Sequence, residues 1–435
     1  MNWSIDRIKR HQHYDRGINF IKLISIVGST EVILKLVGFV SGILIVRMLP
    51  IQEYALYTLA NTMLGTLVMF TDSGISNGVM ALSGKVWKDP KKLGIVLATG
   101  LDLRKKFAFI ALIISTPIII YLLLKNNASW LSAILILLSL IPAFYAALSD
   151  SLLEITPKLH QDITTLQKNQ LRIGFGRLVL TVLTIFIFPW TAVIILASGI
   201  PQIYGNYRLK IINKKFVDSD QKPDPKIRKE ILRIVTKILP NVIFYALSGQ
   251  IVIWILSVFG NSTDLASIGA LGRFAALMAF FTTISGTLFI PRFSRLEENK
   301  ETLLKYFLFF QLVLFIAAAF ILLIVFLFPT QMLWLLGTSY SSLSSELFLI
   351  MLSNCIGLIT AMTGNLIGSR GHFLNPIFVI GLNLGAVIMA YFIWDLTTLR
   401  GILYYSIFYQ IISLIVNYIF GFWVILFNKK KLMNN

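Results

Sequence analysis

Twelve apolar stretches, most of them long enough to cross a lipid bilayer as a helix, recur through the 435 residues of the sequence. About 20 apolar residues are needed for one helical crossing. A chain in lipid must satisfy its backbone hydrogen bonds internally, and helices do so within a single segment. The pattern predicts an all-α polytopic membrane protein with spans near 24–46, 55–79, 107–124, 131–153, 173–188, 191–206, 238–259, 267–290, 307–328, 347–368, 374–393 and 402–427.

Composition agrees with this fold class. Apolar side chains make up 56% of the residues and charged ones only 14%, with a mean hydropathy of +0.78, which is far from the composition of a soluble globular domain. The single cysteine, Cys355, lies in an apolar stretch, so we predict no disulfide framework and no CxxC site. No small-residue cleavage site follows the first stretch, which predicts an uncleaved first helix.

The net charge of +19 has two interpretations, a nucleic-acid partner or membrane orientation. With both termini placed in the cytoplasm, nearly all of the 39 Lys and Arg residues fall on cytoplasmic segments, as the positive-inside rule requires. The exceptions are Arg47, Lys125 and Arg400 on outer links, and Lys35, Arg177 and Arg273 within spans. The distribution of Lys and Arg between the two sides of the membrane therefore explains the net charge without a nucleic-acid partner.

The longest polar stretch divides the predicted spans into six and six. It covers residues 208–237 and contains the sequence KPDPK. We predict an N-terminal half over 1–207, with a cytoplasmic lead-in at 1–22, a basic cytoplasmic linker at 208–237, and a C-terminal half over 238–435. Two six-helix halves around a central cavity are typical of transporters.

Motifs for catalysis are missing from the sequence. It contains no GxSxG, HExxH or P-loop pattern, and its four histidines fall in predicted loops. We therefore predict no enzymatic activity, no metal site and no cofactor, so that any energy for transport comes from an ion gradient.

Charged residues inside the predicted spans are the most informative ones, because each costs at least ~2.5 kcal/mol to insert unless it faces water or a partner. Glu31 and Lys35 are four residues apart and share a helix face, where they can form a structural ion pair. Lys35 and Asp72 lie at similar predicted depths, so a bridge between these two is the alternative. Glu31 and Asp72 are thus candidates for ion coupling or for structural ion pairs.

Three cations are candidates for binding an anionic head group. They are Lys35, Arg47 at the outer end of the first span, where snorkelling to the interface is the alternative, and Arg273 within a run of small residues. Ammonium and guanidinium groups bind phosphate oxygens strongly where water is scarce, so these three predict a lipid-diphosphate site. By contrast, Asp150, Glu154 and Arg177 lie near predicted span ends, where solvation at the membrane edge accounts for them.

Sugars would require side-chain amides and aromatic faces within the spans. Our candidates for glycan contacts are Asn61, Tyr245, Gln250 and Asn365. For each of them, a hydrogen bond between helices is the alternative role.

The residue order around the first two spans resembles a known family. Arg47-Met-Leu-Pro50 ends the first span, Glu53-Tyr54 with Tyr57 follows, and Asp72-Ser-Gly74 lies in the second; weaker similarity occurs at 291–295 and 368–371. This order resembles the polysaccharide flippases, notably the O-antigen flippases, of the multidrug/oligosaccharidyl-lipid/polysaccharide exporter superfamily. Two departures are Ala55, where the family usually has glycine, and Ser41-Gly42, where the lipid II flippases carry an Arg-Asp pair.

The resemblance implies a twelve-helix protein of the bacterial inner membrane. Its members move undecaprenyl-diphosphate-linked oligosaccharides from the cytoplasmic to the periplasmic leaflet. For this chain it implies an O-antigen, capsule or similar repeat unit as cargo, H⁺ or Na⁺ as coupling ion, and polysaccharide polymerase or chain-length machinery as further partners.

Two other functions stay open at this stage. A cation-coupled multidrug antiporter of the same superfamily would need acidic residues in its cavity for cationic cargo. A membrane polysaccharide polymerase or glycosyltransferase would need a sizeable outer loop, whereas the longest outer link here, about 329–346, is short and lacks Lys, Arg and His.

Overall fold

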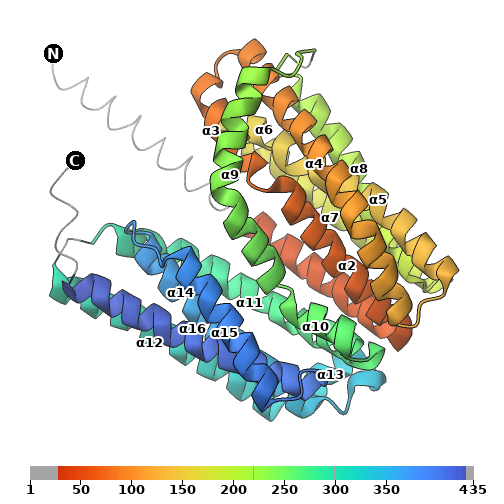
Figure 1. The fold of residues 1–435 in the computed structure, drawn as a ribbon, viewed down its shortest axis with the longest axis vertical. Coiled ribbons are helices and arrows are strands. Elements are labelled where there is room, and N and C mark those ends of the chain that lie inside the picture. Colours follow the sequence, from red (N-terminus) through yellow and green to blue (C-terminus); the bar gives the residue numbers. More distant parts are fainter. Residues whose placement is uncertain (1–27, 219, 297–298, 428–435) are drawn as a thin grey trace, which may run out of the picture. The chain divides into compact units, whose positions relative to one another are not determined.

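The computed structural model describes residues 28–218, 220–296 and 299–427, excepting the side chains at 241, 245, 247, 277, 279–280, 283–288 and 291. The described part is helical throughout and contains no strand. It begins with helix Gly28–Met48 and continues with α2 (Ile51–Asp72), α3 (Ile75–Val86), α4 (Pro90–Lys125), α5 (Trp130–Leu153), α6 (Ile155–Leu159), α7 (Ile163–Ile187), α8 (Thr191–Asn213), α9 (Pro225–Ser248), α10 (Ile251–Phe259), α11 (Ser262–Ser294), α12 (Lys300–Leu327), α13 (Pro329–Leu336), η1 (Thr338–Tyr340), α14 (Ser344–Gly368), α15 (Pro376–Ile393) and α16 (Leu399–Phe427) (Figure 1).

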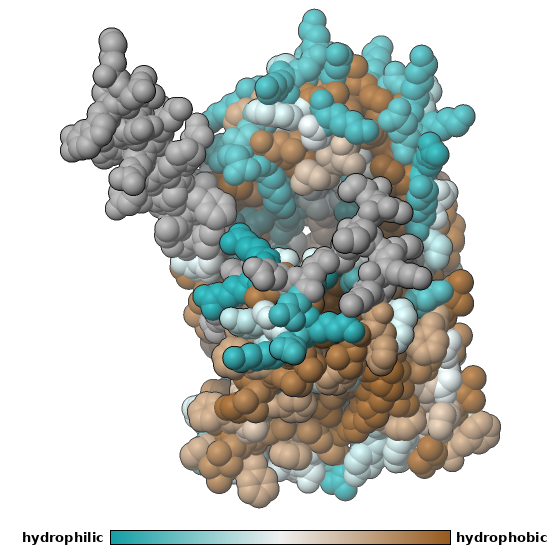
Figure 2. All heavy atoms as spheres, turned by 90° about the vertical axis from the view of Figure 1, so that its left-hand side faces the viewer, coloured by the Kyte–Doolittle hydropathy of each residue, from teal (hydrophilic) through white to brown (hydrophobic). Residues whose placement is uncertain are grey.

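The all-α membrane fold predicted from the sequence is confirmed. Each of the twelve predicted spans overlaps one of these helices or two consecutive ones, and residues 24–27 of the first span lie outside the described residues. Within the described residues, eight helices are long and apolar enough to cross a membrane by length and composition alone. Large apolar side chains are exposed along them, for example Phe309, Leu312 and Phe320 on α12, and apolar side chains cover much of the face drawn in Figure 2. Such exposure is expected where lipid is the solvent.

The chain forms two compact units. The N-terminal unit comprises Met1–Ser41, Met63–Ile120 and Leu131–Ile243, and the C-terminal unit comprises Gly42–Thr62, Tyr121–Trp130 and Phe244–Asn435. Helix Gly28–Met48, α2, α4 and α9 therefore each contribute residues to both units. The division into halves at residues 208–237 stays a prediction.

Each unit has its own apolar core. In the N-terminal unit, α7 and α8 lie side by side, and a buried cluster includes Ile75 and Val79 of α3, Leu93 of α4 and Ile231 of α9. In the C-terminal unit, α14 packs against α11, α12 and α16, and Phe293, Phe307 and Phe310 are part of its buried cluster.

Helix α4 begins well before its apolar part. The Asp89 carboxylate accepts hydrogen bonds from the backbone N–H groups of Lys91 (3.1 Å) and Lys92 (3.2 Å), and Pro90 takes the first helical position, where its missing N–H costs nothing. The Lys92 N–H bond holds the pKa of Asp89 below its usual value. Residues 90–106, which lie outside the predicted spans, are therefore helical as well.

The polar stretch that joins α8 to α9 is attached to α4. The Asp218 N–H donates to the Pro90 carbonyl at 3.2 Å, the Asp224 N–H donates to Thr99 Oγ1 at 2.9 Å, and Arg228 Nη2 donates to Asp102 Oδ2 at 2.7 Å. Most of the predicted linker at 208–237 is therefore helical or hydrogen-bonded to α4, because α8 runs to Asn213 and α9 starts at Pro225.

Substituting Gly94 with alanine is expected to loosen this attachment. A Cβ at position 94 would lie 2.2 Å from the Asp218 carbonyl oxygen, which is backbone and cannot rotate away. We expect a loss of roughly 1–3 kcal/mol in unfolding free energy, the usual cost of overpacking. Gly84→Ala on α3 is the matched control, because its Cβ meets nothing within 4 Å, and it should be neutral or stabilising by up to about 1 kcal/mol. Denaturant titration of both variants in mixed micelles measures the difference, and equal stability would contradict this packing.

Candidate functional site

Arg273 lies in the interior of α11 and is held by two tyrosines of α2. Its guanidinium carbon is 5.9 Å from the ring centroid of Tyr54 and 5.7 Å from that of Tyr57, and its Nε donates to the Tyr54 hydroxyl at 3.1 Å. A Cβ at Gly42 would lie 3.0 Å from Arg273 Cδ, so the absence of a side chain there leaves room for the arginine. We call Gly42, Tyr54, Tyr57 and Arg273 the arginine–tyrosine cluster; all four belong to the C-terminal unit.

The segment after α12 supplies two more aromatic residues to this unit. Arg47, at the end of helix Gly28–Met48, is exposed and lies 4.8 Å from the ring centroid of Trp334 in α13. Tyr340 in η1 packs edge-on against Tyr54 at 6.4 Å. It is 3% exposed, and its hydroxyl has no hydrogen-bond partner among the described residues. Among the described residues, both arginines lie over aromatic rings and neither forms an ion pair with a carboxylate.

The carboxylates of the C-terminal unit lie away from the middle of its helices. Among its described residues, Glu53, Asp264, Glu301 and Glu346 are in first helical turns, and Asp395 is in a loop. Within this unit neither Arg47 nor Arg273 forms an ion pair with a described residue. The Arg273 charge is therefore free to interact with an anion, for which a planar guanidinium is well suited.

The remaining predicted residues lie on separate elements. Glu31 and Lys35 are half-buried on helix Gly28–Met48 in the N-terminal unit. Asn61 on α2 and Asn365 on α14 are exposed, and Gln250 between α9 and α10 is half-buried. The Tyr245 side chain lies outside the described residues. The roles assigned to all of these from the sequence stay predictions.

Asp72 is paired with a residue that sequence reasoning missed. Its carboxylate accepts hydrogen bonds from Arg104 Nη2 and from Ser76 Oγ at 2.7 Å. Arg104 is 3% exposed, and its Nη1 also donates to Ser151 Oγ at 2.7 Å and to the Leu148 carbonyl. A partner of Asp72 in the N-terminal unit is thus Arg104 of α4.

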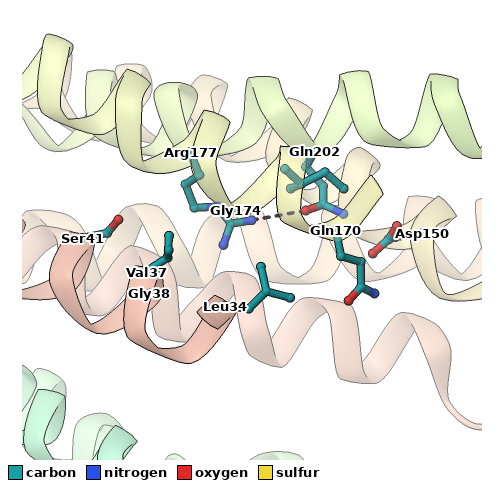
Figure 3. Close-up of a pocket in the computed structure, with 10 residues that line it drawn as sticks. Leu34, Val37, Gly38, Ser41, Asp150, Gln170, Gly174, Arg177 and Gln202 are labelled. Carbon is teal, nitrogen blue, oxygen red and sulfur yellow. Dashed lines mark hydrogen bonds between the residues drawn. The ribbon is translucent and has the colours of Figure 1, made fainter. Parts of the chain in front are cut away.

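The N-terminal unit also contains a pocket of about 240 Å³ that polar and apolar side chains line together. Arg177 Nη2 donates to Gln202 Oε1 at 3.2 Å, and Gln170 and Asp150 lie beside this pair, across from helix Gly28–Met48 (Figure 3). Leu34, Val37, Gly38, Ser41, Ile173 and Gly174 complete the lining. Asp150 and Arg177, assigned to the membrane edge from the sequence, therefore face one cavity.

Comparison with known proteins gives structural relatives only. No protein-family model matches the chain, and no curated protein matches it. The lipid II flippase MurJ in an inward closed conformation superposes with a TM-score of 0.73 at 12% identity, covering 91% of this chain and 87% of that one. An inward-facing multidrug resistance MATE family transporter of the MOP superfamily gives 0.67 at 16% identity, covering 90% and 94%.

A third relative comes from Pyrococcus furiosus. It is a MOP superfamily transporter described by a reverse polarity of its binding pocket that suggests a different function, with a TM-score of 0.55 at 14% identity over 93% of this chain and 95% of that one. All three are solved structures of MOP superfamily transporters, and each covers nearly the whole chain. The protein is therefore an all-α polytopic membrane protein with the fold of the MOP superfamily transporters.

Proposed function

We propose that the protein is a flippase that moves an undecaprenyl-diphosphate-linked oligosaccharide, such as an O-antigen or capsule repeat unit, across the bacterial inner membrane. The observation that supports this best is Arg273, a guanidinium in a helix interior that contacts two tyrosines and forms no ion pair with any described carboxylate of its unit. An uncompensated charge inside a membrane protein marks a pathway for a charge of the opposite sign, and a diphosphate supplies that charge.

The other elements of the proposal follow from the sequence. Lys35 and Arg47 add cations for the diphosphate, and Asn61, Tyr245, Gln250 and Asn365 contact the glycan. Transport proceeds by alternating access, without enzymatic chemistry, and is coupled to H⁺ or Na⁺ with Asp72 or Glu31 taking part. The charge distribution favours cytoplasmic N- and C-termini. Polysaccharide polymerase or chain-length machinery would receive the product.

Reconstitution tests this function directly. In proteoliposomes that carry an undecaprenyl-diphosphate-linked glycan, the protein is expected to make the glycan accessible to a glycosidase added outside, faster with an imposed H⁺ or Na⁺ gradient. Protein-free liposomes and heat-inactivated protein are the controls. Glycosidase access equal to the controls, with and without a gradient, would refute the flippase assignment.

A cation-coupled multidrug antiporter is the second candidate, because MATE multidrug transporters share the fold over as much of the chain as MurJ does. Its cationic cargo would require uncompensated carboxylates where Arg273 now lies, and the described carboxylates of that unit are at helix ends or in a loop. We therefore expect no efflux of a fluorescent cationic dye from the same proteoliposomes under an H⁺ or Na⁺ gradient. Gradient-driven dye efflux without glycan movement would favour the antiporter.

A further inference from the structure

The pocket of the N-terminal unit has no role in the flippase function proposed above. Four elements build it: helix Gly28–Met48, α5, α7 and α8. Its polar side chains converge from three of these helices, with Asp150 on α5, Gln170 and Arg177 on α7, and Gln202 on α8, opposite the first described helix (Figure 3). Convergence of polar groups from different helices on one cavity is the usual form of a ligand site.

Two polar atoms of the lining are buried without a hydrogen-bond partner among the described residues. They are Ser41 Oγ, on a residue that is 6% exposed, and Asp150 Oδ1. Buried polar atoms normally have partners, and leaving one unsatisfied is costly. These two oxygens therefore indicate that something with hydrogen-bond donors enters the pocket.

The charges of the lining restrict what can enter. Asp150 would repel an anion, and Arg177 would repel a bare cation. The two do not form an ion pair with each other; instead, Arg177 donates to Gln202. A neutral ligand with several hydroxyl groups suits such a lining, because each hydroxyl both donates to a carboxylate or serine oxygen and accepts from a guanidinium or amide.

The shape and the apolar part of the lining agree with this ligand class. A cavity of about 240 Å³ has room for many water-sized groups, since one water needs only about 10–15 Å³. Leu34, Val37 and Ile173 give it an aliphatic side, against which the C–H face of a sugar ring can lie. A Cβ at Gly38 would meet nothing within 4 Å, so the cavity is open at that position.

We infer that this pocket binds one sugar ring of the transported glycan, with Asp150, Arg177 and Gln202 as the hydrogen-bonding residues. The inference rests on the proposed function, because the flippase cargo is the source of the sugar. It assigns the glycan a second contact region, in the N-terminal unit, besides the diphosphate site proposed at Arg273.

An engineered thiol can report whether the pocket is occupied. The only cysteine, Cys355, is buried, and Cys355→Ala removes it. Gly38→Cys then places a thiol at the open side of the pocket, and Gly84→Cys on α3 places a matched thiol at an equally open position that does not line it. The rate of reaction with a small water-soluble methanethiosulfonate is measured by mass spectrometry on the full-length protein. The probes are free hexoses, N-acetylhexosamines, the intact lipid-linked glycan, sodium ions and inorganic pyrophosphate.

A sugar or the lipid-linked glycan is expected to slow the reaction of Gly38→Cys several-fold and to leave that of Gly84→Cys unchanged. Adding Asp150→Asn or Gln202→Leu should raise, about tenfold, the sugar concentration that halves the reaction rate of the Gly38→Cys thiol. This is the effect of losing a hydrogen bond to a charged or well-placed polar group. Adding Arg273→Gln should not alter protection by a free sugar, although it should strongly slow glycan translocation.

The outcomes separate this inference from the proposed function. Protection by a free sugar that Asp150→Asn weakens, without any glycan movement in proteoliposomes, supports the sugar site and refutes the flippase. Glycan movement that persists while no sugar and no lipid-linked glycan protects Gly38→Cys refutes the sugar site alone. Protection by sodium ions or by pyrophosphate, but by no sugar, also overturns it, because the pocket would then bind an ion.

Discussion

Changing Arg273 to glutamine is expected to slow translocation of the lipid-linked glycan by about 100-fold. The guanidinium contacts Tyr54 and Tyr57 and forms no ion pair with a carboxylate in the part of its unit that the structure describes, so its other N–H groups are available to the diphosphate. Each charge-assisted hydrogen bond is worth ~1.5–3 kcal/mol, and the loss of two amounts to two or more factors of ten. The glycosidase-accessibility assay in proteoliposomes measures the rate.

Two matched variants test whether this effect comes from the guanidinium itself. Arg273→Lys keeps the charge but loses the planar donor fork, so an intermediate rate is expected. Tyr54→Phe keeps the ring beneath the arginine and removes only the hydroxyl that accepts from Arg273 Nε, so a reduction of about fivefold is expected from loss of one positioning hydrogen bond. Arg273→Gln at the wild-type rate, in protein of wild-type thermal stability, would remove this residue from the substrate pathway.

Replacing Asp72 with leucine is expected to destabilise the protein by about 3–5 kcal/mol, the usual cost of removing one partner of a buried ion pair. The remaining Arg104 is 3% exposed and would hold an uncompensated charge inside the N-terminal unit. Denaturant titration in mixed micelles, followed by tryptophan fluorescence, gives the change in unfolding free energy.

The double variant Asp72→Leu/Arg104→Leu is expected to recover part of this loss, because replacing both charges by apolar groups removes the unpaired charge. Arg104→Leu alone should cost less than Asp72→Leu, since the Asp72 side chain that it leaves is 32% exposed and retains its hydrogen bonds from Ser76. If Asp72→Leu unfolds at the wild-type denaturant concentration, the pair does not stabilise the fold.

Hydropathy predicted the helices well and their ends poorly. Periodic apolar stretches locate the part of a helix that lies in lipid, but α4 continues through seventeen polar and mixed residues before its predicted start, from Pro90 to Lys106. The Asp89-Pro90 pair is a helix-start signal that would have shown this. The second predicted span is interrupted because Ser73 and Gly74 adopt positive φ angles of 41° and 86°, which ends α2 at Asp72.

Because hydropathy misplaces the ends of helices, the sequence analysis also missed residues of the candidate site. Arg104 lies between the predicted spans 55–79 and 107–124, so its pairing with Asp72 was not predicted. Asp150 and Arg177 are near the ends of apolar stretches in the sequence, where edge solvation accounts for single charges. Only tertiary packing brings them to one pocket, because their helices are not adjacent in sequence to helix Gly28–Met48. Tyr54 and Tyr57 were singled out only as motif residues, and their contacts with Arg273 come from the structure.

Some helices begin in one compact unit and end in the other, and this restricts how the units can move. The chain passes from one unit to the other inside helix Gly28–Met48, α2, α4 and α9. These connections are therefore helical and not flexible loops. A movement of one unit relative to the other would have to bend these helices. Pro117 in α4 and Pro240 in α9 lie three residues before the points where these helices pass from one unit to the other, and because a proline removes one backbone hydrogen bond of a helix, both helices are weakened near these points.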